Sequence, residues 1–405
     1  MNTAAKILFS CALSIIPSSY AEAALNKLGA MGESFTDEYW DSGASTFAIN
    51  WVSQLVLFRG IDFGPTAAQA GVGTWGEPRR FGYEFNWARG SATSSTLLTQ
   101  GQHTGCAGQF VSNGVSSAVL AIGFNNFASG GTAYRAIYSN AWSASQIQTY
   151  VNQTVSNIET ALVTVRNAGV SVALANIFDS GLLPAATTSL TNASARDRVT
   201  VAIQSVNAGV STLAQKYQVP LMDWYGLVSA ILGPNTNLHA SLKVGNVTIN
   251  LRGIDSGSSH TNAFVDGAHP NTVIQGLFAN LFLQTFVSGY GATNALFSEQ
   301  EVLSHAGIAY GGTDTVPAQI GAYTNYIFLP VRPKFTSISL AGTNVTLRFS
   351  TVSNQFYLVE RRDDLAAGSW TKVASNFPGN GAIASLTNGV PLNSLEGFYR
   401  VRQLP

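Results

Sequence analysis

Short apolar runs alternate with helix-length amphipathic segments along most of this 405-residue chain. The clearest run, "SAVLAIGFN" at 117–125, is continuously apolar, which is typical of a strand buried on both faces of a parallel sheet. A helix is predicted over 143–168, where Ser143 and Gln146 form a capping box before an apolar face of helical spacing. This alternation predicts an α/β fold in which helices cover both faces of a parallel sheet.

The remaining segments before residue 330 extend the same pattern. The first run, which follows the N-terminal segment, predicts only a weak strand. A pair of alternating runs around Gly245-Asn246 predicts a small hairpin that decorates the sheet just before its last helix. Strands are expected at 25–32, 170–178 and 219–225, helices at 194–218 and 271–291, a hairpin at 241–251, and a further capped helix from Ser298.

The composition changes at the prolines near 330–333. Four short β runs follow, separated by turn residues and with no helical periodicity, which predicts a small antiparallel sandwich. We therefore expect one large domain at 24–330 and a small all-β module at 331–405. Its aromatic residues could line a carbohydrate or cell-surface contact, although alternating aromatics more often form a sandwich core.

Residues 1–23 have the features of an export signal: Lys6, the apolar run "ILFSCALSII", and the small residues "AEA" at 21–23. The apolar run is too short to span a bilayer, and no later stretch is long and apolar enough. The sequence therefore predicts a secreted protein, extracellular or periplasmic, without integral membrane association.

Charge and cysteine content exclude other classes of protein. The formal net charge of +0 gives no electrostatic attraction to nucleic acid or anionic lipid. Cys11 would leave with the signal, so Cys106 would have no partner for a disulfide. No Cys/His cluster with metal-ligand spacing is present, and we expect neither a metal nor another cofactor.

The stretch "GESFTDEY" at 32–39 places Ser34 after an expected strand and before an expected helix. A serine at such a turn exposes its hydroxyl at the carboxyl edge of a parallel sheet, where α/β folds bind ligands. Ser34 is therefore a candidate nucleophile, which would need a base, a carboxylate to orient that base, and donors for an oxyanion.

Of the five histidines, only His269 has a carboxylate three residues before it, in "DGAHPN" at 266–271. Within a tight turn, Asp266 can accept from the imidazole Nδ1–H and leave Nε2 free to face a serine. His260, with Asp255 nearby, is a distant second candidate for the base.

Two further stretches offer oxyanion donors. Gly90, in "FNWARGSATSS" at 85–95, lies in a loop where its bare backbone N–H can approach a ligand. Asn125 ends the most apolar strand, in "GFNN", and its side-chain amide can donate to an oxyanion. Glycine and asparagine are common turn residues, so neither stretch is specific alone.

Together the four stretches "MGESFTDEY", "NWARGSAT", "GFNN" and "DGAHPN" resemble the SGNH, or GDSL, hydrolase family, in the family's order and over roughly 25–291. The resemblance implies a flavodoxin-like sheet, Ser34 as nucleophile, His269 as base oriented by Asp266, and an oxyanion hole of Ser34 N–H, Gly90 N–H and the Asn125 amide. "NWARGSAT" is similar to the lipase-like branch. The implied reaction is hydrolysis of a carboxylic ester through an acyl-enzyme.

Three positions depart from the family pattern: Glu33 replaces the usual Asp, Arg89 or Ser91 interrupts a glycine pair, and Asn126 replaces an Asp. None of them removes a catalytic group. The substrate could be a lipid-like or small acyl ester, or an O-acetyl group on a polysaccharide. A non-catalytic surface-binding protein on the same fold is the alternative from another class.

Overall fold

The computed structural model describes residues 24–40, 43–257, 259–353, 355–363, 369–389 and 397–404, so the predicted export signal lies outside the described residues. A five-stranded sheet forms the centre of the α/β part, with the order β1-β2-β3-β4-β8. The first four strands run parallel and β8 pairs antiparallel with β4. Their bounds are β1 (Gly29–Gly32), β2 (Ser117–Ala121), β3 (Ser171–Ala175), β4 (Leu221–Met222) and β8 (Ile327–Phe328).

A short extended segment adds to this sheet on the free side of β1. Lys27 and Asp62 form a parallel bridge, and Leu28 N–H donates to the Asp62 carbonyl at 3.0 Å. With this segment counted second, the parallel order is 2-1-3-4-5, the order of flavodoxin-like sheets. The expected fold class is thus confirmed.

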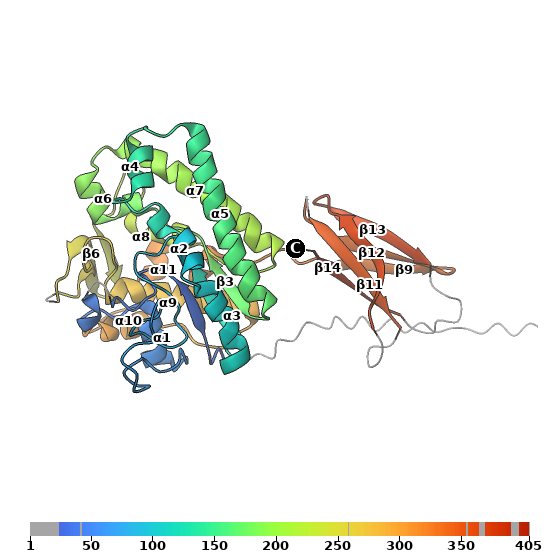
Figure 1. The fold of residues 1–405 in the computed structure, drawn as a ribbon, viewed down its shortest axis with the longest axis horizontal. Helices are drawn as coiled ribbons and strands as arrows, with labels where there is room; N and C mark the ends of the chain where they lie inside the picture. Colours follow the sequence, from blue (N-terminus) through green and yellow to red (C-terminus); the bar gives the residue numbers. More distant parts are fainter. Residues whose placement is uncertain are drawn as a thin grey trace, which may run out of the picture.

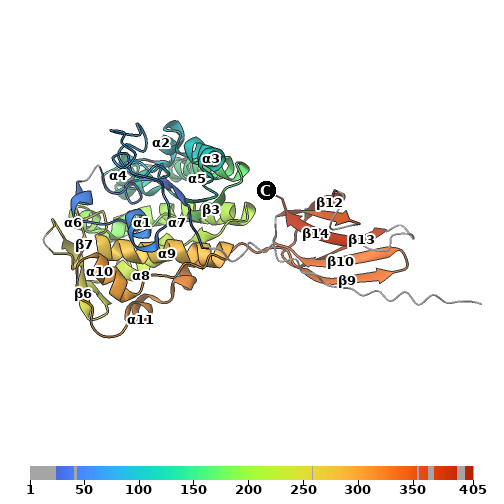
Figure 2. The same cartoon turned by 90° about the horizontal axis from the view of Figure 1, so that it is seen from below.

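Alternate residues of the central strands enter two separate apolar cores. In β2, Ala118 and Leu120 pack into one core and Val119 and Ala121 into the other, as the two-residue period of a strand requires. One core is closed mainly by α3, α5 and α7, and the other by α1, α8 and α9. Figures 1 and 2 show these helices on the two sides of the sheet. Their bounds are α1 (Trp51–Arg59), α3 (Gln102–Asn113), α5 (Ala144–Asn167), α7 (Ala193–Lys216), α8 (Trp224–Leu232) and α9 (Thr272–Tyr290).

Several shorter helices and turns complete this part of the chain. They are α2 (Ser94–Thr99), α4 (Thr132–Tyr138), α6 (Pro184–Ser189), α10 (Glu299–His305) and α11 (Val316–Ile320), with 3₁₀ turns η1 (Ala44–Thr46), η2 (Phe124–Asn126), η3 (Ser180–Leu182) and η4 (Tyr323–Tyr326). Among the described residues, none of the helices combines the length and apolar character that crossing a bilayer requires.

The sequence predicted α5, α9 and α10 with their N-terminal caps, and α7 without a named cap, and the structure confirms these elements. The helix expected directly after Ser34 is wrong, because residues 34–40 form turns. The strand expected at 219–225 is only two residues long, since the Asp223 side chain accepts from Gly226 N–H at 2.9 Å and starts α8. The predicted hairpin forms, but it joins a separate sheet rather than the central one: β5 (Ser241–Val244), β6 (Val247–Ile254) and β7 (Asn262–Phe264).

The C-terminal strands form two three-stranded antiparallel sheets, ordered β13-β10-β9 and β12-β11-β14. Side chains from both sheets meet in one apolar core that includes Leu347, Phe349, Tyr357 and Val359. This agrees with the expected sandwich of two packed sheets. The strands are β9 (Phe335–Ala341), β10 (Asn344–Ser350), β11 (Phe356–Arg362), β12 (Thr371–Pro378), β13 (Ile383–Gly389) and β14 (Phe398–Gln403).

The capping box of α5 provides a test of the local interactions that define the fold. Ser143 Oγ accepts from Gln146 N–H at 3.3 Å, and Gln146 Oε1 accepts from Ser143 N–H at 2.9 Å. Replacing Ser143 with alanine is expected to lower the free energy of unfolding by about 1 kcal/mol. The exposed Ser145→Ala, two residues later in the same helix, is the control and should cost almost nothing. Equal denaturation midpoints for both variants would contradict this account.

Candidate active site

Ser34 lies two residues beyond the end of β1, at the carboxyl edge of the parallel strands. The carbonyl of Glu33 accepts from the N–H groups of Thr36 and Asp37, which makes a single tight turn around the serine. A side chain at Gly32 would place its Cβ 2.5 Å from the Ala121 carbonyl oxygen of β2. Glycine at this position therefore lets the two strands approach where the serine is presented.

His269 lies in a tight loop between β7 and α9. The Asp266 carboxylate accepts from the backbone N–H of Ala268 and His269, at 3.0 and 2.8 Å, and Val265 N–H donates to the His269 carbonyl. The Asn271 side chain caps α9 and donates to Asp255, which is buried. The loop is thus held at both ends.

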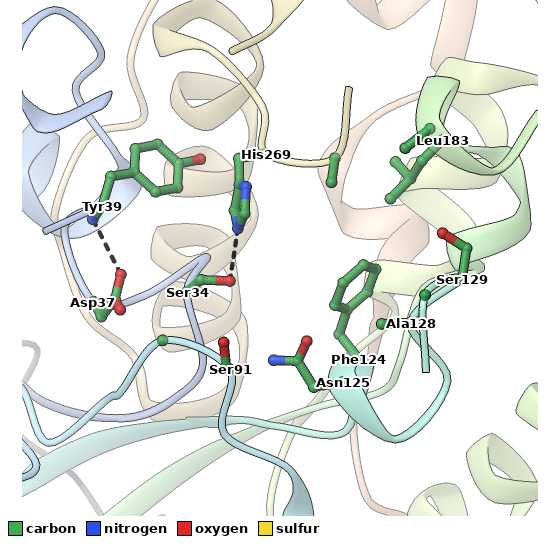
Figure 3. Close-up of a pocket in the computed structure, with 14 residues that line it drawn as sticks. Ser34, Asp37, Tyr39, Ser91, Phe124, Asn125, Ala128, Ser129, Leu183 and His269 are labelled. Carbon is green, nitrogen blue, oxygen red and sulfur yellow. Dashed lines mark hydrogen bonds between the residues drawn. The ribbon is translucent and has the colours of Figure 1, made fainter. Parts of the chain in front are cut away.

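Ser34, His269 and Asp266 form one chain of hydrogen bonds. His269 Nε2 is 2.8 Å from Ser34 Oγ, and its Nδ1 is 2.6 Å from Asp266 Oδ2. Figure 3 shows the His269 ring directed at the serine. Burial alone would raise the pKa of Asp266, but the hydrogen bonds from the His269 ring and backbone outweigh it and hold the pKa at about 2. Asp266 is therefore an anion at neutral pH.

Aromatic groups surround the imidazole. The Phe35 and Tyr39 rings lie 5.2 and 5.5 Å from the His269 ring, measured between centroids. The Tyr39 hydroxyl donates to the Pro270 carbonyl at 2.7 Å, so it fixes the backbone next to the histidine. These contacts restrict the rotation of the imidazole away from Ser34.

The loop that carries Gly90 is joined to the end of β1. Arg89 N–H donates to the Gly32 carbonyl at 3.1 Å, and the Asn86 amide donates to the Thr36 carbonyl. Gly90 thus lies at the serine, where the sequence places an oxyanion donor. Ser91, which interrupts the glycine pair, has a φ of 63°, a left-handed conformation that favours glycine.

Asn125 belongs to η2, directly after β2. Gly123, the residue directly before η2, has a φ of 121°, and a side chain at this position would overlap Ile177. Asn125 Nδ2 donates to the Ala92 carbonyl at 3.1 Å, which fixes the orientation of the amide. Figure 3 shows this amide nitrogen on the side of Asn125 that faces Ser91 and Ser34. Asn126 points elsewhere: its Oδ1 accepts from Ser94 N–H at 2.9 Å and so anchors α2.

A cavity of about 380 Å³ opens beside the Ser34–His269 pair. On one side it is lined by the polar Asp37 and Ser91, and on the other by the apolar Phe124, Ala128 and Leu183 together with the hydroxyl of Ser129 (Figure 3). The sequence did not single out these residues as lining a site. The complete lining is Ser34, Asp37, Tyr39, Gly90, Ser91, Phe124, Asn125, Ala128, Ser129, Gly130, Leu183, Ala185, Ala268 and His269.

Three buried carboxyl groups lie within the stretch that carries the serine: Glu33, Asp37 and Glu38. Burial raises the pKa of Glu38 to about 8 and that of Glu33 well above its ordinary value, although hydrogen bonds from Asn86 and Gly123 respectively oppose the shift. Glu33 Oε2 has no hydrogen-bond partner among the described residues. Glu38 is therefore mostly neutral at pH 7.

Asp37 is the one carboxyl of this group that lines the cavity. Burial raises its pKa to about 6, although the hydrogen bond from Tyr39 N–H to Asp37 Oδ1 and the nearby His269 lower it. Asp37 lies inside the stretch "GESFTDEY" at 32–39, but its burial depends on residues that are distant in the sequence.

The remaining histidines are not among the residues that line the cavity. His260 Nδ1 is 3.2 Å from Asp255 Oδ2, the same carboxylate oxygen that accepts from Asn271. This second Asp–His pair therefore lies at the N-terminus of α9 rather than at the serine. His239 and His305 pair with the Ile231 carbonyl and the Gln54 amide oxygen, respectively.

Within the described ranges, no three His, Cys, Asp or Glu side chains gather as a group that could hold a metal ion. Cys106 is buried and unpaired, and burial raises the pKa of its thiol to about 12. The thiol is thus protonated at neutral pH and is a poor nucleophile.

No protein-family model matches the sequence, and no curated protein is similar to it. Solved structures with a related arrangement include a putative acylhydrolase from Bacteroides fragilis (17% identity, 65% of this chain and 87% of that chain, TM-score 0.35). A GDSL-like lipase from Bacteroides thetaiotaomicron has 14% identity and a TM-score of 0.35, and the match covers 67% of this chain and 93% of that chain. A catalytic mutant of an acetylxylan esterase from Geobacillus stearothermophilus has 12% identity and a TM-score of 0.38, and the match covers 67% of this chain and 96% of that chain. At these TM-scores, the fold assignment above rests on the chain's own sheet topology.

The buried Asp37 gives a pH-dependent expectation. In the unfolded chain its carboxyl ionises near its ordinary value of 3.8, but in the folded chain only near 6, so folding becomes less favourable as pH rises between these values. Asp37→Asn should therefore raise the free energy of unfolding at pH 8, relative to its effect at pH 4, by on the order of 3 kcal/mol.

Chemical denaturation of both proteins at pH 4 and pH 8 measures this difference. Asp314→Asn, at an exposed carboxylate, is the matched control and should show a similar effect at both pH values. A pH-independent effect of Asp37→Asn would contradict the assignment of a raised pKa to Asp37.

Proposed function

We propose that this chain is a serine ester hydrolase of the SGNH type, which cleaves carboxylic esters through an acyl-enzyme on Ser34. The supporting observation is the continuous chain from Ser34 Oγ through the His269 ring to the Asp266 carboxylate, at 2.8 and 2.6 Å. Three residue types in this order are what a neutral hydroxyl needs to become a nucleophile.

The first half-reaction begins when Ser34 Oγ attacks the ester carbonyl carbon. Nδ1–H of His269 donates to Asp266, so Nε2 is free to take the serine proton, and the anionic Asp266 stabilises the resulting imidazolium. The carbonyl oxygen becomes an oxyanion. When the bond from carbon to the alcohol oxygen breaks, His269 returns the proton to the departing alcohol.

The oxyanion is held by the Ser34 N–H, the Gly90 N–H and the Asn125 amide in this proposal. Asn125 is oriented by its bond to the Ala92 carbonyl, so its donor needs little reorganisation. Gly90 lines the same cavity as Ser34. Protonation of Asp37, which also lines it, would remove a negative charge near the oxyanion.

In the second half-reaction, water attacks the acyl-enzyme with His269 again acting as the base. A carboxylic acid leaves, and Ser34 regains its proton from His269. No other residue or added group is required for this cycle.

The two ends of the cavity bear on the choice of substrate. The polar end, with Asp37, Tyr39 and Ser91, offers hydrogen-bonding groups for an alcohol that carries hydroxyls, which favours an O-acetylated sugar as the second candidate substrate. The hydrogen bond from Ser34 to His269 argues against the non-catalytic alternative, since binding alone does not require it. Secretion, and a carbohydrate or cell-surface contact by the C-terminal strands, stay predictions from the sequence.

Ser34→Ala tests the nucleophile. The variant should lose more than about 10³-fold in kcat on a short-chain ester such as p-nitrophenyl acetate, because no other group can form the acyl-enzyme. Ser145→Ala, an exposed serine on α5, is the control and should retain full activity. Turnover by Ser34→Ala at the wild-type rate would overturn the proposal.

Asp266→Asn tests the orientation of the base. The amide keeps the size of the side chain but removes the anion that pairs with imidazolium, so kcat should fall by about 10²–10⁴-fold with a smaller change in KM. Thermal unfolding of the variant checks that the fold is retained. A rise in KM with an unchanged kcat would place Asp266 outside the proposed mechanism.

A further inference from the structure

Leu183 lines the catalytic cavity on the same side as Phe124 and Ala128. This residue lines the cavity beside Ser34, and it also lines a second, small apolar void of about 10 Å³. No other residue is shared by the two linings. In Figure 3, Leu183 lies across the cavity from Asp37 and Tyr39, with Ser34 and His269 between them.

The void behind Leu183 is apolar throughout its lining. Its walls come from α8, α9, the end of β7 and Pro270, the residue after the catalytic histidine, and include Val228, Ile231, Phe264 and Phe278. Among the residues that the structure describes, no polar or charged side chain lines it. A hydrocarbon chain that reached this space would lose contact with water without leaving any buried polar group unpaired.

Leu183 is held on a firmly anchored segment. It links η3 to α6. Ser180 Oγ donates to the Phe127 carbonyl, Arg252 donates to the Leu182 carbonyl at 2.7 Å, and Asp179 accepts from Gly181 N–H at 2.8 Å. The Ala185 N–H donates to the Gly267 carbonyl at 3.0 Å, which joins this segment to the loop of Asp266 and His269. Leu183 is 3% exposed. The wall is therefore fixed relative to the catalytic groups.

We infer that Leu183 is the specificity-determining residue that limits the length of the acyl chain, and that this protein prefers esters of short acyl groups. This inference rests on the proposed ester hydrolysis and assigns the two ends of its cavity. The end with Phe124, Ala128, Leu183 and Ala185, where Ser129 is the polar residue, takes the acyl chain. The polar end, with Asp37 and Ser91, takes the alcohol.

Removal of the Leu183 side chain joins the cavity to the void. Leu183→Ala should then shift the acyl optimum by two or more carbons toward longer chains. Each methylene that gains an apolar site raises kcat/KM by about fourfold, so the ratio of octanoyl to acetyl ester rates should rise at least about tenfold.

The test measures kcat/KM on p-nitrophenyl esters from C2 to C10 for wild type, Leu183→Ala and two controls. Leu183→Ile keeps the bulk of the wall and should keep the wild-type preference. Val228→Ala enlarges the void but leaves the wall in place, and should also keep it. Leu183→Val should give an intermediate shift of the acyl optimum. It replaces Leu183→Ala in the test if thermal unfolding shows that Leu183→Ala does not fold.

A second series, acetyl esters of alcohols of increasing chain length, tests which end takes which group. Leu183→Ala should not change how kcat/KM depends on the chain length of the alcohol. A shift in the alcohol series in place of the acyl series, or an equal loss of rate at every acyl length, would overturn the inference. Wild-type protein that hydrolyses no ester in either series would instead count against the proposed function itself.

Discussion

The hydrogen bond between His269 Nε2 and Ser34 Oγ is the interaction on which the rest of this account depends, and it joins residues 235 positions apart in the chain. The serine lies two residues after the end of β1, and the histidine lies in the loop that precedes α9. Every nearby contact reduces the freedom of one partner relative to the other. The Tyr39 hydroxyl fixes Pro270, and the Asp266 carboxylate holds the backbone of its own turn as well as the imidazole. Preorganisation of this kind removes the entropy cost of assembling the groups at each turnover.

The site has a cost in stability. Glu33, Asp37 and Glu38 are buried carboxyl groups in a row around the nucleophile, and burial raises the pKa of each. Glu38 and Tyr39 also adopt left-handed backbone conformations, with φ of 59° and 62°, as does Ser91 in the facing loop. Strain and desolvated acids at one place are typical of functional sites rather than of packing.

Much of this arrangement could be predicted from the sequence, because the signals are local. The capping boxes of α5 and α10, the buried run of β2 and the Asp266–His269 spacing each lie within a few residues, and the structure bears out the elements they predict. The turns at 34–40 could not be predicted, since Glu38 is drawn into the interior by Asn86, which is 48 residues away. Leu183 gave no signal at all. Its role depends on a bond between Ala185 and Gly267 that only the folded chain forms.

The most direct test of the central claim is the site at which the purified protein reacts with a fluorophosphonate probe. The probe phosphonylates a serine only when a base removes its proton, so peptide mass spectrometry should find the adduct on Ser34 of the wild-type protein. His269→Ala, which removes that base, should abolish the labelling while the fold is retained. A wild-type protein left unlabelled, or labelled equally well without His269, would contradict the claim that the histidine activates this serine.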